Sequence, residues 1–451
     1  MDDPRRRTPP DGVLPLMISA GTEDALTHAI LRNVRHLDDV RSDEFYDLAY
    51  TSCLRRAPHP HRAVALAHCP AEAARQFAGL VGDGHERPAG AADGKACAAA
   101  RAEAVHTGHV ALVFNGDGSQ WAGMGADLFQ EEPAFRGAVE DVDRELAPLV
   151  GWSVTDRLTT PPGPWRLDAT DIAQPLLFTL QVGLVALLRD RGFRPRMVLG
   201  RSLGEVAAAH TAGALTLTQA AHLVTSMSRA MAATTGSGRM AAVGLPHADA
   251  LAELAALGGR LELAGINSPQ DVSVAGDPAV LDEWCARLEQ RGVFHRGLVL
   301  DSAFHSSAMD PQRAAFLAGE QGLTPHEGDV PFYSSVTGGR LRGDRLTGGY
   351  WWQNIRRPVR FAHAVDAALK DGADILLEVG PHPDQRVYLR RIVAARHSRP
   401  TVAVLPTVLR DGDGPALIAA AHAALLAFGA TPDWRCHFPR PGRSVRLATA
   451  I

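Results

Sequence analysis

Residues 196–205, Arg-Met-Val-Leu-Gly-Arg-Ser-Leu-Gly-Glu, decide how this chain folds. Residues 196–199 predict a strand, and the helical pattern over 205–210 follows almost at once. The flanking glycines relieve crowding around Ser202, so its hydroxyl is expected to be exposed at a strand-to-helix corner. We therefore predict that Ser202 is a nucleophile and that the backbone N–H of Leu203 forms half of an oxyanion hole. Because the motif is short, an ordinary turn before a helix is the alternative interpretation.

Composition indicates a globular protein with a large core and no general affinity for polyanions. The chain has 451 residues, 46% of them apolar, a net charge of -4 and an isoelectric point near 6.5. These values give no attraction to nucleic acid or to anionic membranes. Five widely spaced cysteines lack metal or redox spacing, which favours a cytoplasmic protein. No signal peptide is predicted, and the apolar segment 175–188 is too short to span a bilayer.

The pattern of apolar segments divides the chain into a main domain with additions at each end and one insertion. The expected parts are a small α/β module at 13–82, a flexible linker at 83–109, a main domain at 110–237 and 302–391, an inserted subdomain at 238–301 and a final segment at 392–451.

The insertion has a strand and helix order of its own. Its predicted order is βαββαβ, over residues 240–244, 247–257, 261–266, 271–275, 278–291 and 293–300. This order is that of a ferredoxin-like unit, and a flap over a cleft is a plausible role for it.

Two further segments supply the parts that a serine nucleophile needs. The strand 110–114 leads into Gly116-Asp117-Gly118, where the backbone can approach a ligand and the N–H of Asp117 can complete the oxyanion hole. A serine hydroxyl also needs a base. Among nineteen histidines, His305 follows the last strand of the insertion, where the chain re-enters the main domain and should line the cleft. A plain strand-helix turn and an unrelated histidine are the alternatives.

Motifs along most of the chain resemble those of the malonyl-CoA:acyl-carrier-protein transacylases and the acyltransferase domains of type I polyketide synthases. The matching segments, in chain order, are 113–125, Gln174-Pro175, 200–205, 266–269, 303–306, 350–359 and 378–383. The first module resembles the linker between ketosynthase and acyltransferase, and the tail resembles a post-acyltransferase segment. The implied fold is α/β, with an α/β-hydrolase-like core, the inserted ferredoxin-like subdomain and the small N-terminal linker module.

The resemblance implies a ping-pong acyl transfer without metal or redox cofactor. His305 would deprotonate Ser202, which attacks an acyl-CoA thioester, and the acyl group then passes to a carrier protein's phosphopantetheine thiol. The N–H groups of Asp117 and Leu203 would hold the oxyanion. The residues that the resemblance places at the substrate are Gln174, Arg201, Met227, Asn267 and Phe304. Polyketide synthase modules are further possible partners.

Charged residues replace the family's usual ones on both sides of the nucleophile. Arg201 stands where the family has histidine, and Asp117 stands where it usually has glutamine. We predict that Arg201 and Asp117 pair across the site and so offset each other's desolvation. The alternative is that both side chains point to solvent.

The position that grips the malonyl carboxylate in relatives carries no charge here. That residue is an arginine 25 positions beyond the serine, and counting from Ser202 reaches Met227. Arg229 lies on a different helical face. We therefore predict a non-carboxylated donor such as acetyl-CoA or a longer or branched acyl-CoA. Two cues favour malonyl-CoA instead: Phe304 accompanies malonyl selection in relatives, and Arg201 could itself pair with a carboxylate. Ser302 departs from the histidine that is common at its position in relatives.

The sequence is compatible with several functions. The acceptor can be a carrier thiol, the hydroxyl of a natural product, as in a tailoring O-acyltransferase, or water, as in an editing hydrolase. A malonyl-specific extender acyltransferase is another alternative, and an inactive docking scaffold is a fourth. Since the sequence starts with methionine and has no ketosynthase or carrier domain, we expect a free-standing protein or an excised domain that takes its carrier from outside.

Overall fold

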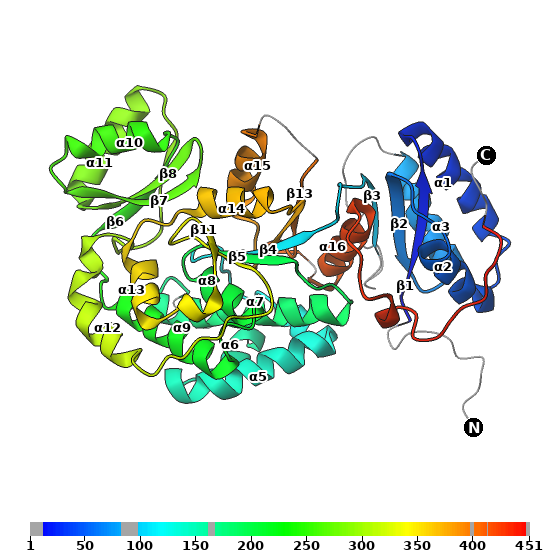
Figure 1. The fold of residues 1–451 in the computed structure, drawn as a ribbon, viewed down its shortest axis with the longest axis horizontal. Helices are drawn as coiled ribbons and strands as arrows, with labels where there is room; N and C mark the ends of the chain where they lie inside the picture. Colours follow the sequence, from blue (N-terminus) through cyan, green and yellow to red (C-terminus); the bar gives the residue numbers. More distant parts are fainter. Residues whose placement is uncertain (1–11, 83–97, 161–166, 397–400, 413, 448–451) are drawn as a thin grey trace.

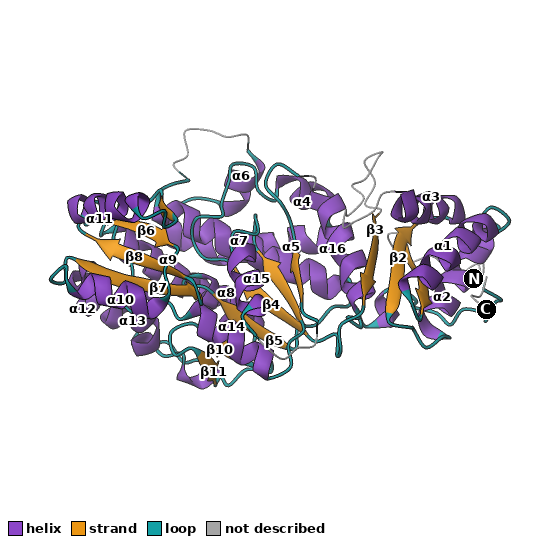
Figure 2. Cartoon of the chain, turned by 90° about the horizontal axis from the view of Figure 1, so that it is seen from above, coloured by secondary structure: helices purple, strands orange, loops and turns teal. Residues whose placement is uncertain are grey.

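Three β-sheets organise the computed structural model, which describes residues 12–82, 98–160, 167–396, 401–412 and 414–447. Figure 2 shows the three-stranded sheet at one end, the four-stranded sheet at the other and the six-stranded sheet between them. The predicted α/β class and its three parts are confirmed by this arrangement.

The central sheet has the strand order β11-β10-β5-β4-β12-β13. All neighbouring pairs are parallel except β10 with β11. Its strands are β4 (Val110–Phe114), β5 (Met197–Gly200), β10 (Phe332–Ser334), β11 (Gly339–Leu341), β12 (Ile375–Val379) and β13 (Ala403–Pro406). Parallel strands align their carboxyl ends at one edge, so the turns after β4, β5 and β12 meet there.

Helices cover both faces of the central sheet because its strands are apolar on both sides (Figure 1). Along β4, Leu112 and Phe114 pack into the large core, whereas Ala111 and Val113 pack against the opposite layer. The opposite layer consists of α14 (Phe361–Lys370) and α15 (Arg386–Ala394). The large core is built from α4 (Ala126–Glu131), α5 (Pro133–Val150), α6 (Val154–Thr159), α7 (Thr170–Asp190), α8 (Gly204–Thr211), α9 (Leu217–Ala232), α12 (Arg313–Gly319) and α13 (Gly348–Arg356).

Helix α7 has 21 residues and is long and apolar enough to cross a membrane by length and composition alone. In the structure, 78% of its most apolar 18-residue window is buried among other helices and the sheet. The helix is longer than the apolar segment 175–188 because polar residues such as Thr170 and Asp190 continue it at both ends. Helix α7 is therefore a core helix in this structure.

The inserted subdomain has the predicted βαββαβ order and an antiparallel sheet with the order β7-β8-β6-β9. Its elements are β6 (Arg239–Val243), α10 (His247–Ala255), β7 (Leu261–Ser268), β8 (Asp271–Gly276), α11 (Pro278–Gln290) and β9 (His295–Gly297). The last strand is shorter than the expected 293–300. Pairing with β6 ends at Gly297, and Val299 is 90% exposed where the chain leaves the sheet.

The N-terminal module contains one strand that falls in the segment predicted to be a flexible linker. Its antiparallel sheet has the order β1-β2-β3, and β3 (Ala98–Glu103) pairs with β2 along its length. Residues 83–97 of that predicted linker lie outside the described residues. The strand was missed because short alanine side chains carry little β signal. The other elements are β1 (Leu14–Ala20), β2 (His61–Ala67), α1 (Glu23–Leu37), α2 (Phe45–Leu54) and α3 (Pro70–Gly82).

The segment after residue 391 joins the main domain to the N-terminal module. Strand β13 pairs with β12, so the central sheet continues beyond the boundary that the sequence pattern indicated. Helix α16 (Gly414–Phe428) then packs against β2 and β3, as Figure 1 shows. The chain finally returns along α2, where Asp47 accepts hydrogen bonds from the backbone N–H and the Nε of Arg443 at 2.7 and 2.8 Å.

We predict that Asp47→Ala releases the C-terminal tail from α2. Asp47 is 2% exposed, so the substitution removes two hydrogen bonds and leaves Arg443 without its partner. The expected loss is about 1–3 kcal/mol of unfolding free energy, measured by urea denaturation, with faster proteolysis near Arg443. Asp43→Ala is the control, since Asp43 forms a solvent-exposed ion pair with Arg41. Equal proteolysis of the two variants would contradict the prediction.

Candidate active site

The predicted strand-to-helix corner forms between the end of β5 and the start of α8. Ser202 lies at its apex with a φ of 53°, a left-handed conformation that few non-glycine residues adopt. A Cβ on Gly200 would lie 2.2 Å from the backbone N of Glu205, and one on Gly204 would lie 2.4 Å from the carbonyl O of Phe114. Both positions therefore require glycine, and the close packing that results presents the serine at the carboxyl edge of the sheet.

His305 reaches Ser202 from the loop that follows the inserted subdomain. The Nε2 of His305 lies 3.0 Å from the Oγ of Ser202, and the histidine is 6% exposed. Its φ is 59°, also left-handed, and its backbone N–H donates to the carbonyl of Ile355 at 3.2 Å. The predicted nucleophile and base are thus in hydrogen-bond contact, 103 residues apart in sequence.

The surroundings of His305 keep its imidazole neutral. Burial and, to a smaller extent, the positive charge of Arg201 lower the pKa of His305 to about 4, against the opposite effect of the backbone carbonyls of Asn354 and Arg357. A neutral imidazole can accept the proton of Ser202. The base is therefore in its active form throughout the neutral pH range.

A buried carboxyl behind the elbow connects the nucleophile to two other elements. Glu205 is fully buried and accepts hydrogen bonds from the hydroxyl of Tyr350 at 2.6 Å, from the Nδ2 of Asn354 at 2.8 Å and from the backbone N–H of Ser335. The Nδ2 of Asn354 also donates to the carbonyl O of Ser202 at 3.2 Å. Burial is the main reason that the pKa of Glu205 rises to about 7. This network holds the strained backbone of Ser202 in place.

The backbone N–H groups of Asp117 and Leu203 lie on the turns after β4 and β5. Among the described residues, neither the N–H of Asp117 nor that of Leu203 donates a hydrogen bond. Leu203 immediately precedes α8, and Asp117 follows β4, which is hydrogen-bonded to β5. Unpaired N–H groups placed beside a nucleophile are the donors that an oxyanion hole requires.

The predicted ion pair between Arg201 and Asp117 does not form. No salt bridge joins them among the described residues; instead, the carboxylate of Asp117 accepts from Gln120 at 2.9 Å and from Gln174 at 3.4 Å. The prediction was wrong because Arg201 binds Asn267 of the inserted subdomain instead, and amide groups solvate the aspartate.

Arg201 connects the elbow with the inserted subdomain. Its Nη2 donates to the Oδ1 of Asn267 at 3.1 Å and lies 3.5 Å from the Oγ of Ser273. The Nδ2 of Asn267 in turn donates to Ser273 at 2.9 Å. Asn267, expected at the substrate, is fully buried and uses its side chain to hold Arg201.

The other residues expected at the substrate are buried in the main domain. Met227 and Gln174 are 0% exposed and Phe304 is 3% exposed. The Nε2 of Gln174 lies 3.4 Å from the Sδ of Met231, one helical turn beyond Met227 on α9. The side chains at these positions are thus thioethers, an amide and an aromatic ring.

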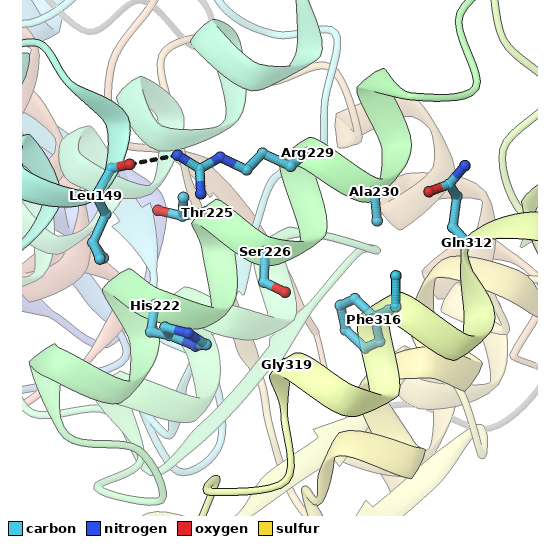
Figure 3. Close-up of a pocket in the computed structure, with 10 residues that line it drawn as sticks. Leu149, His222, Thr225, Ser226, Arg229, Ala230, Gln312, Phe316 and Gly319 are labelled. Atoms are coloured by element: carbon cyan, nitrogen blue, oxygen red, sulfur yellow. Dashed lines mark hydrogen bonds between the residues drawn. The ribbon is translucent and has the colours of Figure 1, made fainter.

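Arg229 does not replace the missing arginine at residue 227. Since a helix turns about 100° per residue, Arg229 lies on the face of α9 away from Met227. Figure 3 shows its guanidinium reaching toward the carbonyl of Leu149, to which it donates a hydrogen bond. This face lines a separate cavity of about 310 Å³ against α12, bordered by His222, Ser226 and Phe316.

No role was predicted for a pair of carboxyl groups beside the elbow. Asn115 donates to Asp384 and to the carbonyl of His382 at 2.5 and 2.7 Å, and Glu378 lies next to Asp384. Burial raises the pKa of both carboxyl groups, and the charge of Arg201 opposes the rise at Asp384. The motif 378–383 contains Glu378 but not Asp384, and only the fold brings the pair close to Arg201. Among the described residues, no three His, Cys, Asp or Glu side chains form a group that could hold a metal ion.

Two family models match the chain. The first, described as an acyl transferase domain, matches residues 111–430, and the second, described as CurL-like, PKS C-terminal, matches residues 15–77. The serine–histidine pair lies within the first match, as expected for an acyltransferase.

Similar proteins are polyketide synthases. The chain is 37% identical over 450 residues to the spectinabilin polyketide synthase system protein NorA' of Streptomyces orinoci and 36% identical over 409 residues to the erythronolide synthase EryA2 of Saccharopolyspora erythraea. These alignments cover 99% and 90% of the chain but only 12% and 11% of the two relatives, so the chain corresponds to a small part of each.

Solved structures show the same fold. The acyltransferase domain from module 8 of the salinomycin polyketide synthase has a TM-score of 0.85 and 32% identity, and the match covers 94% of this chain and 98% of that one. A loading acyltransferase from the avermectin polyketide synthase has a TM-score of 0.67 and 33% identity, with 70% and 99% covered.

We predict that Arg201→Gln shifts the acid-side fall in the rate of acylation to a higher pH than in the wild type. Burial is the larger cause of the low pKa of His305 and stays in the variant, so removal of the guanidinium charge raises that pKa only part of the way from about 4 toward its ordinary value of 6.5. Since only neutral imidazole accepts the proton, kcat/KM of the variant should begin to fall at a higher pH than that of the wild type as the solution is acidified. Acyl-CoA consumption is measured from pH 5 to 8. Arg229→Gln is the control, and identical profiles for Arg201→Gln and the wild type would contradict the prediction.

We predict that Glu205→Gln reduces the loss of stability between pH 4.5 and 7. The pKa of Glu205 in the folded protein, about 7, is above its ordinary value of 4.5, so the folded state binds more protons in this range. Stability therefore falls as pH rises through it, by about 3 kcal/mol from this group. Urea unfolding at pH 5 and 7.5 measures the difference. The exposed Glu140 supplies the control Glu140→Gln, and an unchanged pH dependence in Glu205→Gln would disprove the assignment.

Proposed function

We propose that this chain, which belongs to the acyltransferase-domain family of modular type I polyketide synthases, transfers an acyl group from coenzyme A through an ester on Ser202 to a carrier protein's phosphopantetheine thiol. The observation that carries the proposal is the 3.0 Å contact between Ser202 and His305 beside two unpaired backbone N–H groups. Nucleophile, base and oxyanion donors are the set that thioester acyl transfer needs.

The first half of the reaction forms the acyl-enzyme. His305 takes the proton of Ser202 as Oγ attacks the thioester carbonyl, and the N–H groups of Asp117 and Leu203 donate to the oxyanion. The tetrahedral intermediate collapses with cleavage of the C–S bond, and the protonated His305 gives its proton to the leaving coenzyme A sulfur. In the second half, His305 deprotonates the incoming thiol, which attacks the ester and releases Ser202.

The donor we propose has no free carboxylate. Met227 is fully buried on α9, and a carboxylate there would lose its water without gaining a cation. Arg201 is turned toward Asn267 and Ser273, which argues against its use as the malonyl partner. An uncharged acyl chain, in contrast, gains dispersion contacts with the thioethers of Met227 and Met231.

Intact-mass measurement after incubation with acyl-CoAs tests both the acyl-enzyme and its donor. We expect the mass to rise by the acyl group with acetyl- or butyryl-CoA, with malonyl-CoA at least tenfold slower. Ser202→Ala should show no rise with any donor. Failure of every donor would support the inactive scaffold, and faster reaction with malonyl-CoA would support an extender acyltransferase.

Two further arms refine the same experiment. Met227→Arg should raise the malonyl to butyryl rate ratio, and Met227→Leu serves as the matched uncharged control. If Met227→Arg does not fold, the donor series on the wild type still decides. Adding a carrier protein, a hydroxyl acceptor or neither to the acyl-enzyme distinguishes the thiol transferase from the tailoring enzyme and from the editing hydrolase.

A further inference from the structure

The carboxylate of Asp117 lies at the catalytic centre without a counter-charge. Its Oδ1 accepts from the Nε2 of Gln120 at 2.9 Å and its Oδ2 accepts from the Nε2 of Gln174 at 3.4 Å. Neither amide carries charge, and no arginine, lysine or histidine pairs with Asp117 among the described residues. Partial loss of water raises the pKa of this carboxyl, against the effect of both amides. A cation in contact with it would relieve that cost.

Gln174 adds an unused acceptor at the same place. Its side chain is 0% exposed, and its Nε2 is directed to Asp117 and to the Sδ of Met231. Its Oε1 is buried and has no hydrogen-bond partner among the described residues. Buried amide oxygens are nearly always paired, so this oxygen is available to accept from a donor group of a ligand.

These acceptors lie between the elbow and α9: a Cβ on Gly116, next to Asp117, would lie 2.8 Å from the carbonyl O of Arg201, and Gln174 contacts Met231 of α9. The backbone N–H of Asp117 is a proposed oxyanion donor. The carboxylate of the same residue would therefore lie close to the thioester oxygen. Gln174 extends from Asp117 to Met231, which is four residues from Met227 and on the same helical face. An acyl chain that runs from Ser202 toward Met227 would therefore pass Asp117 and Gln174.

We propose that the acyl group carried by this enzyme bears an amino group, whose ammonium form binds the carboxylate of Asp117 and the Oε1 of Gln174. The inference rests on the proposed acyl transfer from coenzyme A and specifies its substrate class. A malonyl carboxylate in this place would meet a like charge. Arg201, the nearby cation, is turned to Asn267 on the inserted subdomain and does not neutralise Asp117.

A hydroxyl group fits these acceptors less well than an ammonium group. A hydroxyl has one proton to donate, and it leaves the charge of Asp117 uncompensated. An ammonium has three donors and supplies the opposite charge in surroundings where water is largely excluded. The ammonium therefore satisfies both the orphan amide oxygen and the carboxylate.

The test compares acyl-CoAs of nearly equal size and different charge on the wild-type chain. The first set is β-alanyl-, butyryl-, 3-hydroxypropionyl- and malonyl-CoA, and the second is 4-aminobutyryl- and pentanoyl-CoA. The rate of ester formation on Ser202 is followed by intact mass and expressed as kcat/KM. We expect the amino donor to exceed its hydrocarbon counterpart at least tenfold in one of the two lengths, and malonyl-CoA to be the slowest.

Asp117→Asn tests whether the carboxylate is the cause. Because this residue also contributes a backbone N–H, the readout is the ratio of amino donor to hydrocarbon donor within each variant, which is expected to fall to about one. Glu140→Gln, which removes a negative charge from an exposed position of α5, should keep the wild-type ratio. If Asp117→Asn does not fold, the donor series on the wild type decides.

Four outcomes would overturn the inference. If butyryl- and pentanoyl-CoA match or exceed the amino donors while malonyl-CoA is poor, the ammonium site is wrong and the proposed donor class survives. If 3-hydroxypropionyl-CoA is the fastest donor, the acceptors bind a neutral group. If malonyl-CoA is fastest, the proposed donor class fails together with the inference. An amino preference that persists in Asp117→Asn would also contradict it.

Discussion

The hydrogen bonds accepted by the buried Glu205 hold the catalytic centre together. Glu205 lies on the first turn of α8, and its partners come from the loop after β10 and from α13. Asn354 connects this carboxyl to the carbonyl of Ser202, whose left-handed backbone would otherwise be unfavourable. Helix α13, which carries Asn354, ends beside His305, whose backbone N–H donates to the carbonyl of Ile355. The buried carboxyl of Glu205 therefore orients the nucleophile and supports the helix that positions the base.

The inserted subdomain is joined to this centre through the residue that precedes the nucleophile. Arg201 reaches Asn267 and Ser273 on β7 and β8, and the backbone of β7 bonds to Val359 of the main domain. The charge of Arg201 also lowers the pKa values of His305 and Asp384. One guanidinium thus contributes both to domain contact and to the protonation state of the base.

Local signals were sufficient wherever a single strand or turn carried the information. The strand at 110–114 agrees with the structure to the residue, because β-branched and large apolar side chains are concentrated there. The alanine-rich β3 and the short β9 were not predicted correctly, since their pairing depends on neighbours far away in sequence. The pairing of Arg201 with Asp117 failed for a related reason: it assumed a direction for two side chains that packing decides.

The sequence by itself determined the nucleophile, the base, the glycine-containing turns after β4 and β5 and the βαββαβ insertion. Each follows from residue types whose backbone or chemical requirements are local, such as the glycines at 200 and 204. Only the tertiary structure decided that Arg201 binds Asn267, that Glu205 supports Ser202 and that Asp117 has amides for neighbours. Electrostatic partners are chosen by distance in space and by burial, and neither quantity can be read from spacing along the chain.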